Sequence, residues 1–177
     1  MLKTALALIG AMLFCGTAIA DNYMGIGVGQ LRLEDSAGGI SLDADDPGAK
    51  LFAGWQFSDH FSLELAYIHG GSPEDTIAGV SVKTDPRAMQ VSGIGTLPLA
   101  DNLGVYLRAG LLSWKNEVSV ADDATFKTDG EDFSWGLGTS LALGSRSAIR
   151  LEYESADLDG TDVSFISLSG VLRFGAN

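Results

Sequence analysis

The sequence is short of cysteine, of basic residues and of long apolar runs, and each shortage excludes a class of protein. Cys15 is the only cysteine among 177 residues, so the chain can form no intramolecular disulfide. Its 11 basic residues against 23 acidic ones give a net charge of −12, which argues against nucleic acid as a partner. After Asp21, no apolar run approaches the roughly 18 residues that indicate a transmembrane helix. A hydrophobic content of 46% nevertheless excludes a disordered chain.

The first twenty residues, MLKTALALIGAMLFCGTAIA, have the pattern of an export signal. One basic residue, Lys3, precedes an apolar run, and the small-x-small ending Ala18-Ile19-Ala20 follows it. The run is shorter than the roughly 20 residues that a membrane anchor needs. We therefore expect residues 1–20 to be a secretory signal peptide, cleaved before Asp21, and residues 21–177 to form a single exported domain.

The exported part alternates between apolar and small or polar residues with a period of two, which is typical of β-strands. Eight such segments of about ten residues follow one another, at 22–34, 49–57, 61–70, 87–98, 103–118, 132–143, 147–156 and 162–175. Short connections (58–60, 99–102, 144–146) alternate with longer ones (35–48, 71–86, 119–131, 157–161). Tight turns on one rim and long loops on the other predict an all-β fold, an eight-stranded antiparallel up-and-down barrel.

The two faces of these strands differ in a way that indicates which one meets the solvent. In HFSLELAYIHGG, Leu63, Leu65 and Tyr67 fall on one face, and Ser62 and Glu64 on the other. Over all eight segments the first face is an unbroken apolar band, whereas the second is rich in glycine and serine with few charges. Small residues suit the interior of an eight-stranded barrel, and lipid accepts an apolar exterior. The pattern favours a transmembrane β-barrel, with a soluble lipocalin-like barrel in the periplasm as the alternative.

Aromatic residues sort by height along these strands. We expect two girdles at the membrane surfaces, a periplasmic one of Tyr23, Phe57, Phe61 and Phe174 and an outer one of Tyr67, Trp114, Phe133 and Tyr153.

Several motifs occur together in the order found in one family. They are YMGIGVGQ in the first segment, LELAY in the third, VYLRAG in the fifth, RLEY in the seventh and LSGVLRFG in the last. In this set the chain resembles the OmpA-like and OmpX-like small outer-membrane barrels from Asp21 to Asn177. The resemblance implies the cell outer membrane as the location, outer-membrane lipid and lipopolysaccharide as surroundings, and a monomer. The alternation that ends at Phe174 resembles the signal read by outer-membrane assembly machinery.

Lys50 and four other charges fall on the face that would line the lumen, and we expect the four to form a network: Glu64, Arg108, Arg150 and Glu152. Their charges sum to zero, as a closed interior network requires. In the resembled family a carboxylate–arginine bridge obstructs the lumen, and another lysine and glutamate offer alternative partners. Ile94 and Ser140 occupy those two positions here, so we expect partner exchange to be impaired. The resemblance thus implies a structural role in membrane integrity with limited passage of ions or small solutes.

Catalysis of the kind found in some outer-membrane barrels needs a serine or aspartate partnered with histidine, and the sequence contains no clear set of this kind. The only histidines are His60, in a short turn, and His69, near the outer rim beside Ser72 and Glu74. We therefore expect no catalytic residues, no cofactor and no enzymatic activity.

Acidic residues concentrate in the longer connections and suggest two further hypotheses. Asp157, Asp159 and Asp162 are spaced somewhat like ligands of a hard cation, although the full ligand series is missing. A surface adhesion or recognition module acting through segments 35–48 and 119–131 is the alternative to a purely structural role.

Overall fold

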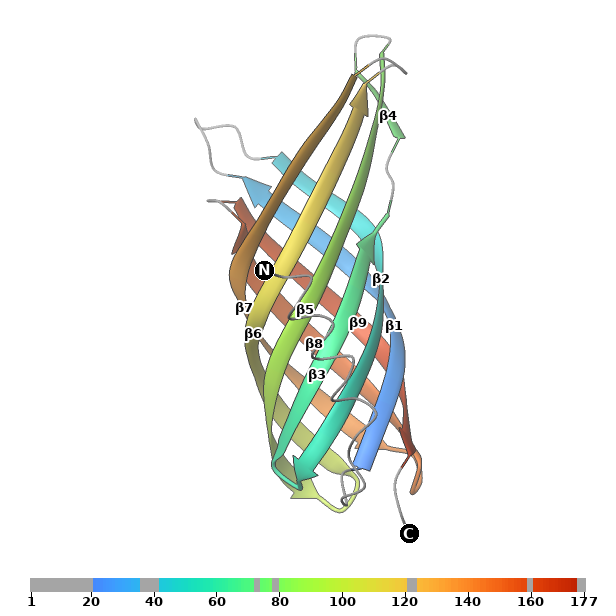
Figure 1. Ribbon diagram of the computed structural model, residues 1–177. Helices are drawn as coiled ribbons and strands as arrows, with labels where there is room; N and C mark the ends of the chain where they lie inside the picture. The colour runs from blue at the N-terminus through green and yellow to red at the C-terminus, as the bar shows by residue number, and fades with distance from the viewer. Residues whose placement is uncertain are drawn as a thin grey trace.

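The chain folds into a closed antiparallel β-barrel. The computed structural model describes residues 21–35, 42–71, 74–77, 80–120, 124–158 and 161–174, and the expected signal peptide, 1–20, lies outside these ranges. Eight strands form the wall, which confirms the predicted fold, and a ninth, short strand extends one hairpin (Figure 1). The strands are β1 (Asp21–Asp35), β2 (Leu42–Ser58), β3 (Phe61–Gly70), β4 (Glu74–Ile77), β5 (Val80–Ala100), β6 (Leu103–Val120), β7 (Ala124–Ala142), β8 (Ser147–Leu158) and β9 (Thr161–Phe174).

The order of the strands around the wall follows the chain. Each wall strand pairs with the next, β3 pairs with β5 past the short β4, and β1 pairs with β9 to close the ring. The three short connections predicted from the sequence lie at one end of the barrel, here called the turn end, and the opposite end is called the loop end (Figure 1). At one of these turns, Ser58 Oγ accepts the backbone N–H of Phe61 at 3.2 Å. No helix in the described ranges is long and apolar enough to span a bilayer.

The strands at the loop end are longer than the sequence predicted. Segments 71–86 and 119–131 were expected to be loops, but β4 pairs with the start of β5, and β6 and β7 stay in register as far as Val120 and Ala124. Segment 71–86 contains alternating β-branched residues in Val80-Ser81-Val82. In both segments the pairing satisfies backbone groups even beyond the wall. The hairpins of β5, β6 and β7 therefore rise beyond the rest of the barrel (Figure 1).

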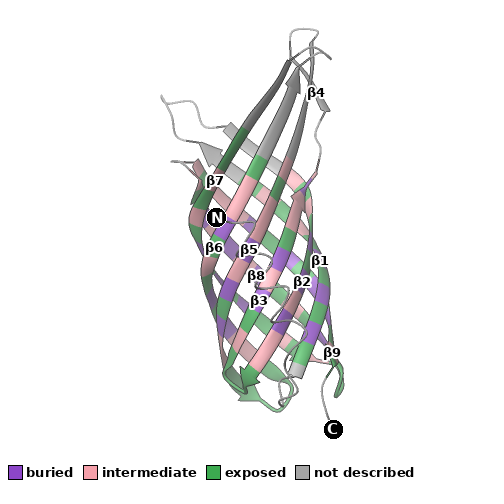
Figure 2. Cartoon of the chain, viewed as in Figure 1, coloured by how far each residue is buried: buried purple, intermediate pink, exposed green. Residues whose placement is uncertain are grey.

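The side chains alternate between exterior and interior as the sequence predicted (Figure 2). The apolar band faces outward, with Leu107 67% exposed and Leu151 54% exposed. Two members of the expected aromatic girdles are the exception, because Tyr23 and Trp114 occupy inward positions of β1 and β6. Trp114 Nε1 donates to Asp132 at 2.7 Å, and the Tyr23 ring is buried in the lumen, so neither belongs to a girdle.

Candidate functional site

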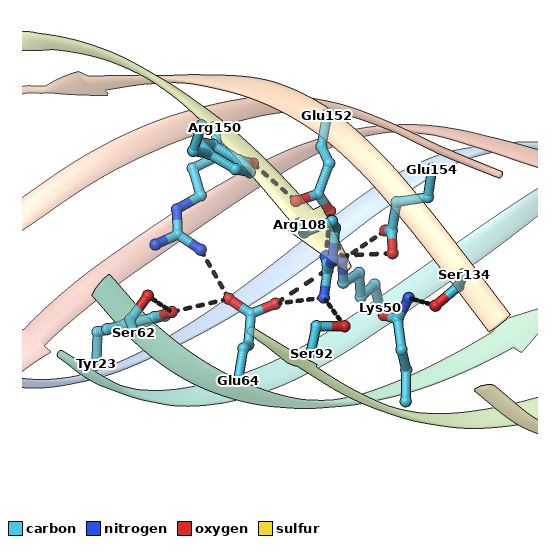
Figure 3. Close-up of polar contacts among 12 residues, drawn as sticks. Tyr23, Lys50, Ser62, Glu64, Ser92, Arg108, Ser134, Arg150, Glu152 and Glu154 are labelled. Atoms are coloured by element: carbon cyan, nitrogen blue, oxygen red, sulfur yellow. Dashed lines mark hydrogen bonds and ion pairs between the residues drawn. The ribbon is translucent and has the colours of Figure 1, made fainter. Parts of the chain in front are cut away.

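Six charged side chains from four strands meet in the middle of the barrel. The lumen charge cluster consists of Lys50 on β2, Glu64 on β3, Arg108 on β6, and Arg150, Glu152 and Glu154 on β8. Each occupies an inward position, and five of the six are buried while Arg150 is mostly buried. Figure 3 shows them converging from opposite walls of the lumen.

Glu64 accepts hydrogen bonds from three side chains. Arg150 Nη1 lies 2.8 Å from Glu64 Oε2, and Arg108 Nη2 lies 3.1 Å from Oε1. The Tyr23 hydroxyl donates to Oε2 at 3.0 Å. Glu64 is only 1% exposed, so these donors replace the water that an ionised carboxylate would otherwise need.

Glu152 and Glu154 form the other anionic side of the cluster. Lys50 Nζ bonds to both carboxylates, at 2.5 Å for Glu154 Oε1. Arg108 Nη1 lies 2.8 Å from Glu152 Oε1 and 3.2 Å from Glu154 Oε2. The Tyr106 hydroxyl donates to Glu152 Oε2 at 2.8 Å. Arg108 thus bridges all three carboxylates and is the central cation of the cluster.

Aromatic rings surround the cation nearest the turn end. The Arg150 guanidinium carbon lies 4.6 Å from the ring centre of Tyr23 and 5.3 Å from that of Tyr106. Stacking of this kind stabilises a guanidinium that has lost water. Tyr23 and Tyr106 therefore each contact both an anion and a cation of the cluster.

Glycines on neighbouring strands make room for these two tyrosine rings. Gly54 lies opposite Tyr23 and Gly138 lies opposite Tyr106 in the strand registers. A Cβ at Gly54 would lie 2.1 Å from Tyr23 Cζ, and one at Gly138 would lie 2.5 Å from Tyr106 Cζ. The two tyrosine rings therefore pack directly against backbone that only glycine leaves uncovered.

We expect Gly54→Ala to lower the free energy of unfolding by about 1–3 kcal/mol, the usual cost of overpacking. The added methyl group displaces the Tyr23 ring and with it the hydroxyl that holds Glu64. Denaturant unfolding in lipid vesicles measures the cost. Gly95→Ala is the control, since its Cβ would come no nearer than 4.0 Å to another atom, and a loss as large as that of Gly54→Ala would contradict the packing argument.

The cluster separates two cavities. The loop-end cavity has a volume of about 310 Å³ and reaches down to Glu154, Gln90 and Ser134. The turn-end cavity has a volume of about 370 Å³ and reaches up to Arg150, Tyr106 and Ser62. No residue lines both, so the cluster and the rings beside it form a layer across the lumen.

The four charges proposed from the sequence lie in this one layer, and two more charges join them. Lys50 and Glu154 were missed, although both fall on inward positions, Glu154 two residues after Glu152 on the same strand. The prediction that partner exchange is impaired did not take Lys50 and Glu154 into account. Ile94 and Ser140 carry no charge, but Lys50 lies 4.0 Å from Glu64 and contacts Glu152 and Glu154, so alternative partners come from other positions.

The remaining candidates lie away from the layer. His60 is exposed in the turn after β2, and His69 lies near the loop end of β3. Asp157 and Asp162 are opposite each other on β8 and β9, whereas Asp159 lies outside the described residues. Among the described residues, no three histidine, cysteine or acidic side chains are grouped so as to hold a metal ion.

Comparison with known proteins agrees with this architecture. Outer membrane protein A of Shigella flexneri is 26% identical over 99% of this chain and 56% of its own length. Outer membrane protein A of Yersinia pseudotuberculosis is 28% identical over 87% of this chain and 48% of its own length, so the chain spans about half of each of these relatives.

Solved structures share the barrel at low sequence identity. Neisserial surface protein A superimposes with a TM-score of 0.73 at 12% identity, covering 86% of this chain and 97% of that one. Ail, the attachment invasion locus protein of Yersinia pestis, solved with the heparin analogue sucrose octasulfate, has a TM-score of 0.69 at 18% identity, with coverage of 89% and 100%. The family model of the outer membrane protein beta-barrel domain matches residues 4–174. The chain therefore belongs to the outer membrane protein β-barrel family and is a protein of the outer membrane.

Proposed function

We propose that the protein is a structural outer-membrane barrel whose lumen is closed to ions by the lumen charge cluster. The observation that carries the proposal is the layer of six mutually paired charges with a separate cavity on either side. In this family the short turns face the periplasm and the longer loops face outward. The layer then lies between the external medium and the periplasm.

The closure rests on the balance of charge within the layer. Three cations and three carboxylates are paired at short distance, so an ion that enters finds no unpaired charge to attract it. It would have to displace a buried ion pair, and leaving a single buried charge without its partner costs several kcal/mol. Rearrangement among the alternative partners is the route by which rare, small conductance would occur.

We expect Glu64→Gln to raise the conductance of the barrel in planar lipid bilayers. The substitution keeps the shape of the side chain but leaves Arg108 and Arg150 with an excess positive charge, which should loosen the layer and favour anions. The native chain should show small or rare openings.

The matched control is Glu131→Gln, which removes the same charge from an exposed position on β7. It should leave the native conductance unchanged. A large, steady conductance in the native chain that ignores Glu64→Gln would rule out closure by this layer.

No enzymatic activity forms part of this proposal. The barrel would act as a monomer among outer-membrane lipid and lipopolysaccharide, after insertion by the assembly machinery. The apolar band supports contact with lipid, because large apolar side chains lie exposed on the wall where a soluble barrel would carry charged ones.

Adhesion through segments 35–48 and 119–131 remains the alternative. Residues 36–41 and 121–123 lie outside the described residues. The acidic side chains of these segments would repel a polyanion such as the heparin analogue bound to Ail, so they favour a basic partner. Cell-binding assays with segment-deleted protein separate adhesion from a purely structural role.

A further inference from the structure

We infer that the loop-end cavity is a binding site for a small neutral amphiphile, with an apolar or aromatic body and one hydroxyl or amide hydrogen-bond donor. This site does not depend on the proposed closure, because it lies on the loop-end side of the charge layer and shares only Glu154 with it. Its volume of about 310 Å³ is at the small end of the range for small-molecule pockets. A whole phospholipid is too large for it.

The walls of the cavity are mostly apolar, although they lie inside a barrel whose deeper interior is charged. They include Leu31, Ile68, Leu112, Trp114, Val163 and Phe165, contributed by β1, β3, β6 and β9. All six lie at inward positions, where the alternation would otherwise place polar or small residues. Apolar walls over a polar floor form the usual plan of a small-molecule site.

The floor offers a hydrogen-bond acceptor that the protein leaves unused. Gln90 is 1% exposed, and its Nε2 donates to Ser134 Oγ at 3.0 Å. Its Oε1 is buried and has no hydrogen-bond partner. Leaving such an atom unsatisfied is unfavourable. Both residues line the cavity, so a turn of the Gln90 amide toward it would let a ligand donate to Oε1 and remove the penalty.

The surrounding charges select a neutral ligand. Four charged residues line the cavity, Asp46, Arg87, Lys115 and Glu154, and their charges sum to zero. Glu154, at the floor, is paired with Lys50 and Arg108. A cation entering the cavity would compete for Glu154 and disturb the layer, whereas an anion would meet the carboxyl group of Glu154 at the floor. The aromatic and aliphatic walls then favour a neutral body, and Gln90 Oε1 fixes its donor end.

Trp114 provides a reporter within the cavity wall. Replacing the outward-facing Trp55 and Trp135 by phenylalanine leaves it as the only tryptophan. The probe is 4-iodobenzyl alcohol, a neutral aromatic alcohol whose iodine quenches indole fluorescence. With the refolded barrel in lipid nanodiscs, we expect saturable quenching of Trp114 above the linear quenching produced by probe dissolved in lipid.

Two variants and one analogue make the test specific. Ala156→Phe, which fills the loop-end cavity, should abolish the saturable phase, whereas Ser140→Phe, which fills the turn-end cavity, should preserve it. Gln90→Leu should weaken binding about tenfold, the effect of one lost hydrogen bond to a buried group. On the unaltered site, 4-iodotoluene, which lacks the hydroxyl, should also bind about tenfold more weakly.

Several outcomes would overturn the inference. Strictly linear quenching by the alcohol would show that the cavity holds only water. Equal affinity for the alcohol and 4-iodotoluene would show that Gln90 Oε1 does not accept a hydrogen bond from the ligand. This comparison uses the unaltered site, so it does not depend on the folding of a variant. Saturable quenching that survives in a folded Ala156→Phe barrel would place the probe elsewhere.

Discussion

Arg108→Met is expected to lower the free energy of unfolding by about 3–5 kcal/mol, the cost of breaking a buried ion pair from one side. Arg108 contacts Glu64, Glu152 and Glu154, and its removal leaves three buried carboxylates with only Lys50 and Arg150 to balance them. Denaturant titration of the barrel refolded in lipid vesicles measures the loss.

A compensating variant distinguishes charge imbalance from lost packing. Arg108→Met combined with Glu152→Gln restores neutrality and keeps the shape of position 152, so it should recover more than half of the loss. Arg146→Met, in the exposed turn before β8, should change stability by no more than about 0.5 kcal/mol. A double variant as unstable as Arg108→Met alone would contradict the electrostatic account of the layer.

Leu107→Arg should lower the free energy of unfolding by about 2–4 kcal/mol, the cost of an arginine at the midplane of a lipid-facing barrel wall. Leu107 lies midway along β6 and points away from the lumen, and Leu151 on β8 should behave in the same way. The measurement is again denaturant titration in lipid vesicles.

Ser134→Arg provides the matched control on the inner face. Ser134 is buried but borders the loop-end cavity, into which a long side chain can extend, so its cost should be smaller. Equal costs at Leu107 and Ser134 would mean that the two faces of the strands have been assigned wrongly.

The wall of the barrel could be predicted from the sequence because one physical rule governs it. Lipid and lumen demand opposite chemistry of alternate residues, so a period of two marks each strand and both of its faces. The same rule places Glu64, Arg108, Arg150 and Glu152 inside. It also places Lys50 and Glu154 there, but neither was included in the predicted network.

Other features depend on contacts between residues far apart in the sequence, and the alternation of residue types within one strand does not specify them. Tyr23 and Trp114 were assigned to girdles by their height, although their positions point them inward. Their partners, Glu64 and Asp132, are 41 and 18 residues away along the chain. The extended pairing of β4 to β7 was missed because polar composition resembles a loop, whereas the hairpin register keeps the backbone bonded.

The ion pairs join strands that are not neighbours in the wall, and this affects how the protein folds. Lys50 and Glu154 are 104 residues apart in the chain, and Glu64 and Arg150 are 86 apart. Neither pair joins neighbouring strands, since β1 and β9 separate β2 from β8, and β3 faces β8 across the lumen. An open sheet cannot make these contacts, so they form only once β1 has met β9. A transition state in which β1 and β9 have not yet met lacks these ion pairs, and interactions absent from the transition state slow unfolding without speeding folding. The charge layer should therefore lower the unfolding rate of the closed barrel and contribute little to its folding rate.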